Sequence, residues 1–175
     1  MVAIANIAMA GWLPIVVLFF TVLPARRAIV IAFVFGWLFL PRISYDLPYL
    51  PAYDHTAATC LGVFAATMIF YPERILSLRP RWFDIPVAVL SLSPFATSLA
   101  NGLGAYDGAS AALDSIVGWL LPYLLGRMYF TKPDELRDLF VGIMLGGLVY
   151  VPLCLWEVRM SPQLHRLVDG FSVTE

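Results

Sequence analysis

Apolar stretches of roughly membrane-crossing length occupy most of this chain, and short connections between them hold most of the charged residues. A helix needs about 20 mostly apolar residues to cross the roughly 30 Å of hydrocarbon in a bilayer. The stretches that approach this length cover residues 5–24, 28–45, 55–71, 85–103, 111–130 and 136–157. The sequence therefore predicts an all-α fold, a polytopic transmembrane helical bundle of about six spans.

The composition agrees with a membrane protein. Hydrophobic residues make up 61% of the 175 residues and charged residues only 13%, whereas soluble domains average about 45–50% apolar and about 25% charged residues. The formal net charge is −1, so the chain has no overall basic field of the kind that attracts nucleic acid. No internal repeat or low-complexity segment divides the chain. We therefore expect a single transmembrane helical domain over residues 1–175, surrounded by membrane lipid and without a nucleic-acid partner.

Prolines and small residues recur within the apolar stretches. The prolines near the middle of a stretch are Pro14, Pro94, Pro122 and Pro152. Small residues recur every four positions at Ala58, Gly62 and Ala66 and at Gly142 and Gly146, and two more flank Pro122 at Gly118 and Gly126. Small residues at this spacing let helix backbones approach closely. We interpret these faces as internal packing surfaces in preference to a dimer face.

The basic residues predict which connections share a side of the membrane. The connections after the first, third and fifth stretches hold eight of them: Arg26, Arg27, Arg74, Arg79, Arg81, Arg127, Lys132 and Arg137. The opposite side holds three: Arg42, Arg159 and Arg166. Because cytoplasmic loops are enriched in lysine and arginine, we expect the first group to face the cytoplasm and both termini to lie outside.

The sequence predicts no metal site and no cofactor. The two cysteines, Cys60 and Cys154, lie inside apolar stretches and are typical of small packing residues. No CxxC or HExxH spacing occurs, which argues against a zinc site. The glycine-rich segment 101–108 lacks the spacing and the lysine of a phosphate-binding loop.

The first outside connection, residues 41–55, is rich in aromatic and polar residues. It holds three tyrosines, Tyr45, Tyr49 and Tyr53, together with two acids, an arginine and a histidine. Aromatic faces with a hydroxyl at the tip suit a sugar ring, which has an apolar face and polar edges. Tyrosines are also enriched where a protein crosses the membrane–water interface. Sugar binding and an interfacial aromatic belt are therefore both open interpretations.

The inside connection over residues 72–84 interleaves three arginines with tryptophan and leucine. The arginines are Arg74, Arg79 and Arg81. This composition is typical of a segment in the headgroup layer of an anionic leaflet. Arginine also grips phosphate through two parallel hydrogen bonds, so phosphate binding is the alternative interpretation.

Charged residues near the ends of the fifth and sixth stretches are candidates for chemistry. Arg127 lies near the end of the fifth, and ionisable residues inside a membrane are functional candidates by default. The residues at the exit of the sixth are Glu157, Arg159, His165 and Arg166. Arginine and histidine suit a diphosphate leaving group, and a carboxylate suits removal of a proton from a hydroxyl. A capped interfacial corner with solvated charges is the alternative.

Two of these segments carry a family resemblance. Residues 122–127 read Pro-Tyr-Leu-Leu-Gly-Arg, and residues 156–165 read Trp-Glu-Val-Arg-Met-Ser-Pro-Gln-Leu-His. They resemble the middle of bacterial O-antigen ligase and polymerase-like membrane proteins, which belong to the exopolysaccharide-production group. The resemblance is specific over residues 120–170, and upstream only hydropathy agrees. It implies a metal-independent transferase that moves a glycan from a polyprenyl-diphosphate donor to an acceptor hydroxyl at the outer face of the bacterial inner membrane.

The resemblance also implies roles for individual residues, because arginines of that family bind the diphosphate. The positions that match its motif are Arg127, Glu157, Arg159 and His165. The candidate catalytic residues are therefore Glu157, Arg159 and His165. The candidate substrate-binding residues are Arg127, Arg166, Tyr45, Tyr49 and Tyr53.

The chain departs from that family in length. The family has around a dozen spans and a large outside loop with an essential histidine, whereas this sequence stops soon after its sixth stretch. We therefore expect the N-terminal portion of such a transferase, inactive alone, whose partner is the missing C-terminal half or a second membrane subunit. The alternatives are a small membrane subunit that binds lipid-linked glycan without catalysis, and a six-span carrier.

Overall fold

The computed structural model of the protein describes residues 2–41, 44–45 and 53–160. These residues are helical apart from short connections and one antiparallel pairing of Tyr45 with Tyr53, which confirms the predicted all-α class. The helices are α1 (Val2–Val22), α2 (Ala25–Phe39), α3 (His55–Phe70), α4 (Pro72–Leu76), η1 (Trp82–Asp84), α5 (Ile85–Ala100), α6 (Ala105–Ser115), η2 (Ile116–Leu120), α7 (Leu121–Tyr129) and α8 (Pro133–Met160).

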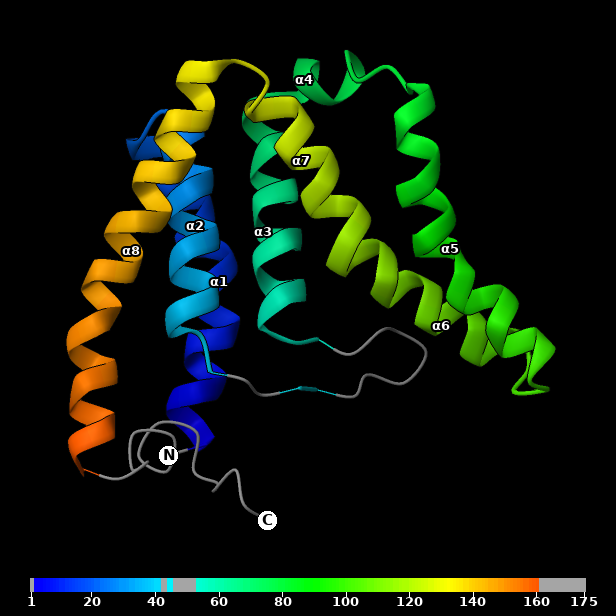
Figure 1. Ribbon diagram of the computed structural model, residues 1–175, viewed down its shortest axis with the longest axis horizontal. Coiled ribbons are helices and arrows are strands. Elements are labelled where there is room, and N and C mark those ends of the chain that lie inside the picture. The colour runs from blue at the N-terminus through cyan, green and yellow to red at the C-terminus, as the bar shows by residue number, and fades with distance from the viewer. Residues whose placement is uncertain (1, 42–43, 46–52, 161–175) are drawn as a thin grey trace.

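The longer elements run up and down in alternation, so their connections gather at two ends of the molecule (Figure 1). We name the upper end in Figure 1 the arginine end, because α4, η1 and the junctions α1–α2 and α7–α8 lie there. The lower end is named the tyrosine end after Tyr45 and Tyr53. The three connections rich in basic residues thus share one end, as their charge predicts.

Three helical segments are long and apolar enough to cross a membrane, by length and composition, within the described residues. They are Trp82–Ala100, Ala105–Tyr129 and Pro133–Trp156. Shorter apolar helices cover Asn6–Val22 and His55–Phe70. These segments indicate a membrane protein.

The expected stretch over residues 28–45 differs most from the observed helix. Helix α2 covers Ala25–Phe39 and ends before Pro41. The residue that precedes a proline is disfavoured in helical geometry, and Leu40 is accordingly extended, with φ −72° and ψ 138°. The helix is therefore shorter than the apolar stretch predicted.

The core lies between α1, α2, α3 and the end of α7. Side chains one turn apart on α1 form one buried stripe, which contains Met9, Trp12, Val16 and Phe20. The predicted small face of α3 meets this stripe, because Ala58 and Ala66 are fully buried and a Cβ on Gly62 would contact Val16 at 3.5 Å. This confirms that these small residues serve internal packing.

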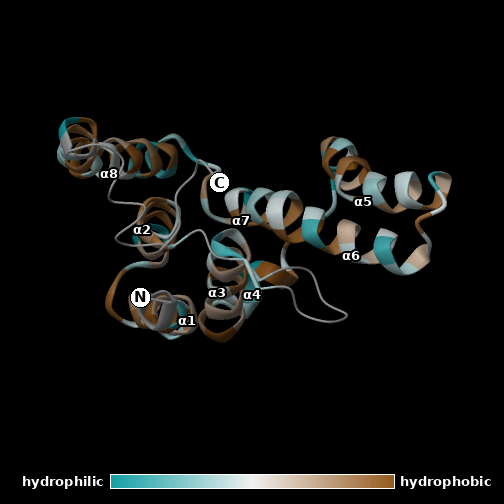
Figure 2. Cartoon of the chain, turned by 90° about the horizontal axis from the view of Figure 1, so that it is seen from below, coloured by the Kyte–Doolittle hydropathy of each residue, from teal (hydrophilic) through white to brown (hydrophobic). Residues whose placement is uncertain are grey.

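The outer helices leave most of their apolar surface uncovered. Only 6% of the membrane-length apolar segment of α8 is buried inside the protein, and only 11% of the segment that contains α5. Brown, hydrophobic segments recur along the visible part of α8 in Figure 2. An apolar surface of this extent requires lipid or other helices around it.

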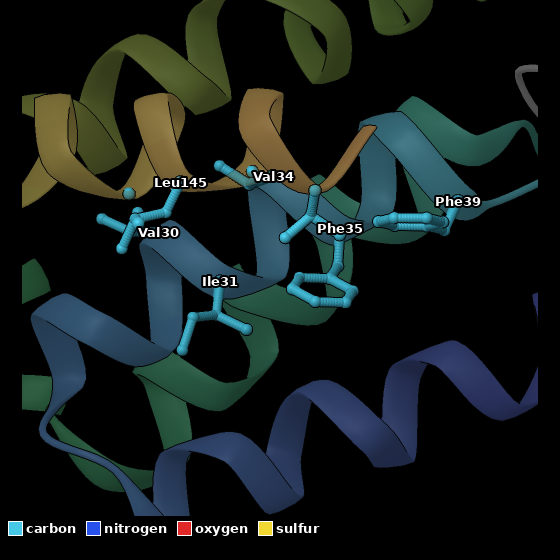
Figure 3. Close-up of a pocket in the computed structure, with 9 residues that line it drawn as sticks. Val30, Ile31, Val34, Phe35, Phe39 and Leu145 are labelled. Carbon is cyan, nitrogen blue, oxygen red and sulfur yellow. The ribbon is translucent and has the colours of Figure 1, made fainter. Parts of the chain in front are cut away.

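Helix α8 packs on α2 through the second predicted pair of small residues. A Cβ on Gly142 would overlap the side chain of Val30, and a Cβ on Gly146 would overlap that of Val34. The two valines lie against α8 in Figure 3, beside an apolar groove of about 220 Å³ between the helices. The groove is lined by Val30, Ile31, Val34, Phe35, Phe39, Gly142, Leu145, Gly146 and Val149.

The continuous helical segment Ala105–Tyr129, made of α6, η2 and α7, contains one wide turn. Residues Ile116–Leu120 are π-helical, and the amide of Leu121 donates to the carbonyl of Ile116. Pro122 follows directly and has no amide hydrogen to donate. The wide turn therefore occurs where regular hydrogen bonding would be interrupted. At Pro94 of α5 a side chain compensates instead, because the Ser93 hydroxyl donates to the freed Leu90 carbonyl at 2.8 Å.

The close contact of α2 and α8 makes a stability prediction. We expect the double substitution Gly142→Ala with Gly146→Ala to destabilise the protein by about 1–3 kcal/mol, because the added methyl groups overpack against stiff valine side chains. Thermal unfolding of the detergent-solubilised protein measures the effect. Gly147→Ala is the matched control, since nothing lies within 4 Å of its Cβ position, and alanine is the better helix former there. An unchanged Tm in the double variant would contradict this packing.

Candidate functional site

A pocket of about 280 Å³ lies between the last turn of α2, the start of α3 and the wide turn η2. We name it the tryptophan pocket. Its lining residues are Trp37, Asp54, Thr56, Ala57, Asp114, Val117, Gly118 and Trp119. It combines two indole rings with two carboxylates from three parts of the chain.

Asp54 is held at the pocket by its role as the N-cap of α3. Its backbone is extended, and its Oδ1 accepts a hydrogen bond of 2.7 Å from the amide of Ala57. An aspartate at this position satisfies one of the free amides of the first turn. Its Oδ2 lies 4.0 Å from Nδ1 of His55. One oxygen therefore fixes the helix end while the other faces polar surroundings.

The wide turn supplies the other side of the pocket. Val117, Gly118 and Trp119 belong to η2, and Asp114 lies just before it in α6. A π-helical turn changes the direction of the side chains that it carries, and such turns are frequent at functional sites. Trp37 and Trp119 are 60% and 66% exposed, so their ring faces are open to a ligand.

The chemistry of the tryptophan pocket suits a polyhydroxylated ring. Indole faces stack on the apolar face of a ligand, and carboxylate oxygens accept hydrogen bonds from hydroxyls. In the part of the chain that the structure describes, no group of three or more His, Cys, Asp or Glu side chains gathers in one place.

Two of the three predicted tyrosines lie together, and both are tied to α1. Tyr45 and Tyr53 exchange two backbone hydrogen bonds of 3.1 and 3.0 Å. The Tyr45 hydroxyl donates to Oδ1 of Asn6, and the Tyr53 hydroxyl lies 3.5 Å from the Met9 carbonyl. Burial raises the pKa of the Tyr53 phenol. Both side chains therefore anchor the connection to the core, and Tyr49 lies outside the described residues.

Arg127 lies at the arginine end, in a polar cluster centred on Asp84. It pairs with Oδ2 of Asp84 and donates to the carbonyl of Arg79 at 2.9 Å. Tyr123, one turn earlier on α7, donates to Oδ1 of Asp84 at 2.7 Å. The Arg127 guanidinium also lies 5.2 Å from the centre of the Phe83 ring. One carboxylate thus joins the start of α5 to the end of α7.

The remaining predicted residues lie at or beyond the other end of α8. Arg159 is exposed in its last turn, and Glu157 lies one half-turn earlier in the same helix. His165 and Arg166 fall outside the described residues. Helix α8 begins just after α7 ends, and at 1.5 Å per residue Arg159 lies roughly 40 Å along it. Arg127 and Arg159 are therefore at opposite ends of the molecule.

Sequence reasoning alone did not single out the tryptophan pocket. Among the residues of this pocket, Asp114 is the one that the sequence marks most clearly as a functional candidate, because it is a carboxylate inside an apolar stretch. Trp37 and Trp119 look like ordinary residues of apolar helices. In the sequence Asp84 is the last residue of the basic connection 72–84, and its two partners lie 39 and 43 positions further along the chain.

The Asp84 cluster makes a second prediction. We expect Asp84→Asn to lower the Tm by several degrees and to speed tryptic cleavage after Arg81, because Arg127 loses its counter-ion and the η1 turn loses its carboxylate acceptor. Thermal unfolding and timed proteolysis measure both effects. Glu73→Gln at the same end is the control, since that side chain is exposed and forms no ion pair among the described residues. Equal effects of the two substitutions would contradict the central role of Asp84.

Comparison with known proteins gives no match for this chain. No family model, no curated protein and no solved structure corresponds to it.

Proposed function

We propose that the chain is part of a membrane-embedded glycan transferase of the O-antigen ligase and polymerase-like kind, which acts on a polyprenyl-diphosphate-linked glycan at the outer face of the bacterial inner membrane. The observation that carries the proposal is the tryptophan pocket, with two exposed indole rings and two carboxylates around one cavity. The sequence resemblance of residues 120–170 gives independent support.

A sugar residue fits the chemistry of this pocket better than an apolar ligand does. The cavity of about 280 Å³ has room for a small group, and carboxylates in an apolar surrounding require polar partners. Sugar hydroxyls supply such donors, while the carbon-bound face of the ring covers indole surface. A purely apolar ligand would give no hydrogen-bond donor to the Asp114 carboxylate or to the Asp54 oxygen that is not bonded to Ala57.

The charge of the donor lipid requires a cation on the same side. Arg159 is exposed at the tyrosine end, where α2 ends just after Trp37 of the tryptophan pocket and α3 begins just after Asp54. Arginine binds diphosphate through charge-assisted hydrogen bonds. In this proposal Arg159 binds the diphosphate, and Glu157 and His165 remain the candidates for proton transfer.

A binding subunit without catalysis is the second candidate. The observation that favours it is the N-cap bond of Asp54, which commits one of the two pocket oxygens of that residue to the backbone of Ala57. A carboxylate held in this way is suited to orienting a ligand. Measured glycan transfer by the isolated chain would decide against this candidate.

The proposed orientation has a direct test by cysteine labelling. The variants Lys132→Cys at the arginine end and Asn101→Cys at the tyrosine end are made in a chain in which Cys60 and Cys154 are replaced by alanine. Both positions are exposed. Because basic connections stay in the cytoplasm, we expect a membrane-impermeant maleimide to label Asn101→Cys in intact spheroplasts and Lys132→Cys only after permeabilisation. The reverse pattern would overturn the orientation, and the cysteine-free chain is the control.

The proposed ligand is tested by native mass spectrometry of the detergent-solubilised full chain. The probes are undecaprenyl diphosphate that carries one hexose and the same lipid without sugar. We expect the sugar to improve the affinity by about tenfold, because two indole faces and two carboxylates contact it. The double substitution Trp37→Ala with Trp119→Ala should remove this difference.

The matched control for the sugar probe is Trp82→Ala, which removes another exposed tryptophan at the opposite end. It should leave the preference for the sugar-bearing lipid unchanged. Arg159→Ala should weaken binding of both lipids equally, since both carry the diphosphate. Equal affinity of the wild-type chain for the two lipids would sink the assignment of the tryptophan pocket to a sugar.

A further inference from the structure

A second pocket lies at the arginine end, between α4, the connection that follows it and the junction of α7 with α8. It has a volume of about 430 Å³. We name it the arginine pocket. Its lining residues are Arg74, Ser77, Leu78, Arg79, Arg81, Phe83, Arg127, Met128, Phe130 and Thr131. Four guanidinium groups thus line one cavity, and no acidic residue is among the lining residues that the structure describes.

Among the residues that the structure describes, one of these four charges has a carboxylate partner. Arg127 pairs with Asp84. Arg74 donates to the Met128 carbonyl at 3.1 Å, and its guanidinium lies 4.6 Å from the centre of the Tyr129 ring. Among the described residues, Arg79 and Arg81 form no ion pair. Like charges that share a cavity repel one another, and a bound anion removes that repulsion.

Two arginines of the pocket form hydrogen bonds between the same two segments in opposite directions. Arg74 reaches from α4 to a carbonyl at the end of α7, and Arg127 reaches from α7 to the Arg79 carbonyl. Arginine is well placed at the C-terminus of a helix, where carbonyls are free. Both cross-links fix the connection against α7. Arg79 and Arg81 are exposed, and their guanidinium groups have no hydrogen-bond acceptor among the described residues. The Arg81 guanidinium lies 5.8 Å from the centre of the Phe83 ring.

The surroundings of the arginine pocket identify the kind of anion. Leu76 and Trp82, which flank the arginines in the sequence, are 86% and 81% exposed. Exposed leucine and tryptophan beside arginine are typical of a segment at the level of lipid headgroups. A guanidinium fork matches the oxygens of a phosphate. An anion that meets this pocket therefore arrives from the membrane surface and carries phosphate.

We propose that the arginine pocket binds the phosphate group of an anionic membrane lipid, with Arg79 and Arg81 as its principal ligands and Arg74 and Arg127 as the frame. The site lies at the opposite end from the tryptophan pocket and does not depend on the function proposed there. Its occupant differs from the glycan donor in its position and in lacking any need for a sugar.

The test uses the full chain in detergent and measures retained lipid by native mass spectrometry. The probes are phosphatidylglycerol and phosphatidylcholine. We expect the wild-type chain to prefer phosphatidylglycerol, and the double substitution Arg79→Gln with Arg81→Gln to weaken that binding by at least about tenfold, because charge-assisted hydrogen bonds are lost. Both arginines are exposed, so the variant should keep the wild-type Tm.

The matched control is Arg27→Gln with Arg137→Gln, which removes two exposed charges at the same end but outside the pocket. We expect less than about a threefold loss, the share due to general attraction. An equal loss in both double variants would overturn the site in favour of a diffuse basic surface. Displacement of phosphatidylglycerol by millimolar inorganic phosphate would overturn the lipid assignment, whereas retention of the lipid under that competition supports it.

Discussion

The contact between the small face of α3 and the buried stripe of α1 is the constraint on which the rest of the structure depends. Ala58, Gly62 and Ala66 bring the two backbones close, and Val16 fills the space above Gly62. Helix α3 also touches α2, α4, η2 and α7, so it joins the parts that build both pockets. A larger side chain at Gly62 would displace α3 from α1 and with it the N-cap that holds Asp54. In a lipid environment such close packing replaces the hydrophobic effect as the source of helix association.

Most buried hydroxyls of this apolar frame have hydrogen-bond partners nearby, whereas Nε1 of Trp12 and Oγ of Ser91 are buried without one among the described residues. The Thr59 and Thr67 hydroxyls donate to carbonyls four residues earlier at 2.8 Å, and the Tyr129 hydroxyl lies 3.3 Å from Oγ1 of Thr67. Asp84 is different, because it joins residues from two segments far apart in the sequence. The arginine end is therefore organised by two carboxylates, since Glu135 accepts from the amides of Thr131 and Lys132 and lies 3.9 Å from Nε of Arg26. The tyrosine end is organised by backbone pairing and by hydroxyls that reach α1.

Much of the architecture could be predicted from the sequence, because apolar length, small-residue spacing and the position of basic residues are local patterns. The helical class, the internal role of Gly62 and Gly142, and the gathering of basic connections at one end follow from such patterns. Helix α2 ends before the apolar stretch does, because Pro41 disfavours helical geometry at Leu40. The tryptophan pocket could not be predicted, because Trp37, Asp54 and Trp119 meet only through the packing of three helices. Glu157 and Arg159 stay predictions, as does the resemblance that singled them out.

The wide turn η2 affects how the length of the helical segment Ala105–Tyr129 can change between related sequences. A π-helical turn is the geometry that a single added residue produces within an α-helix, and the extra residue is absorbed inside the turn. The directions in which side chains point before Ile116–Leu120 therefore do not fix the directions in which they point after it. Trp119 sits within that turn, while Arg127 lies beyond it and keeps its register with Asp84. An insertion or deletion near the tryptophan pocket can therefore be absorbed in this turn, and the residues of α7 that line the arginine pocket need not rotate with it.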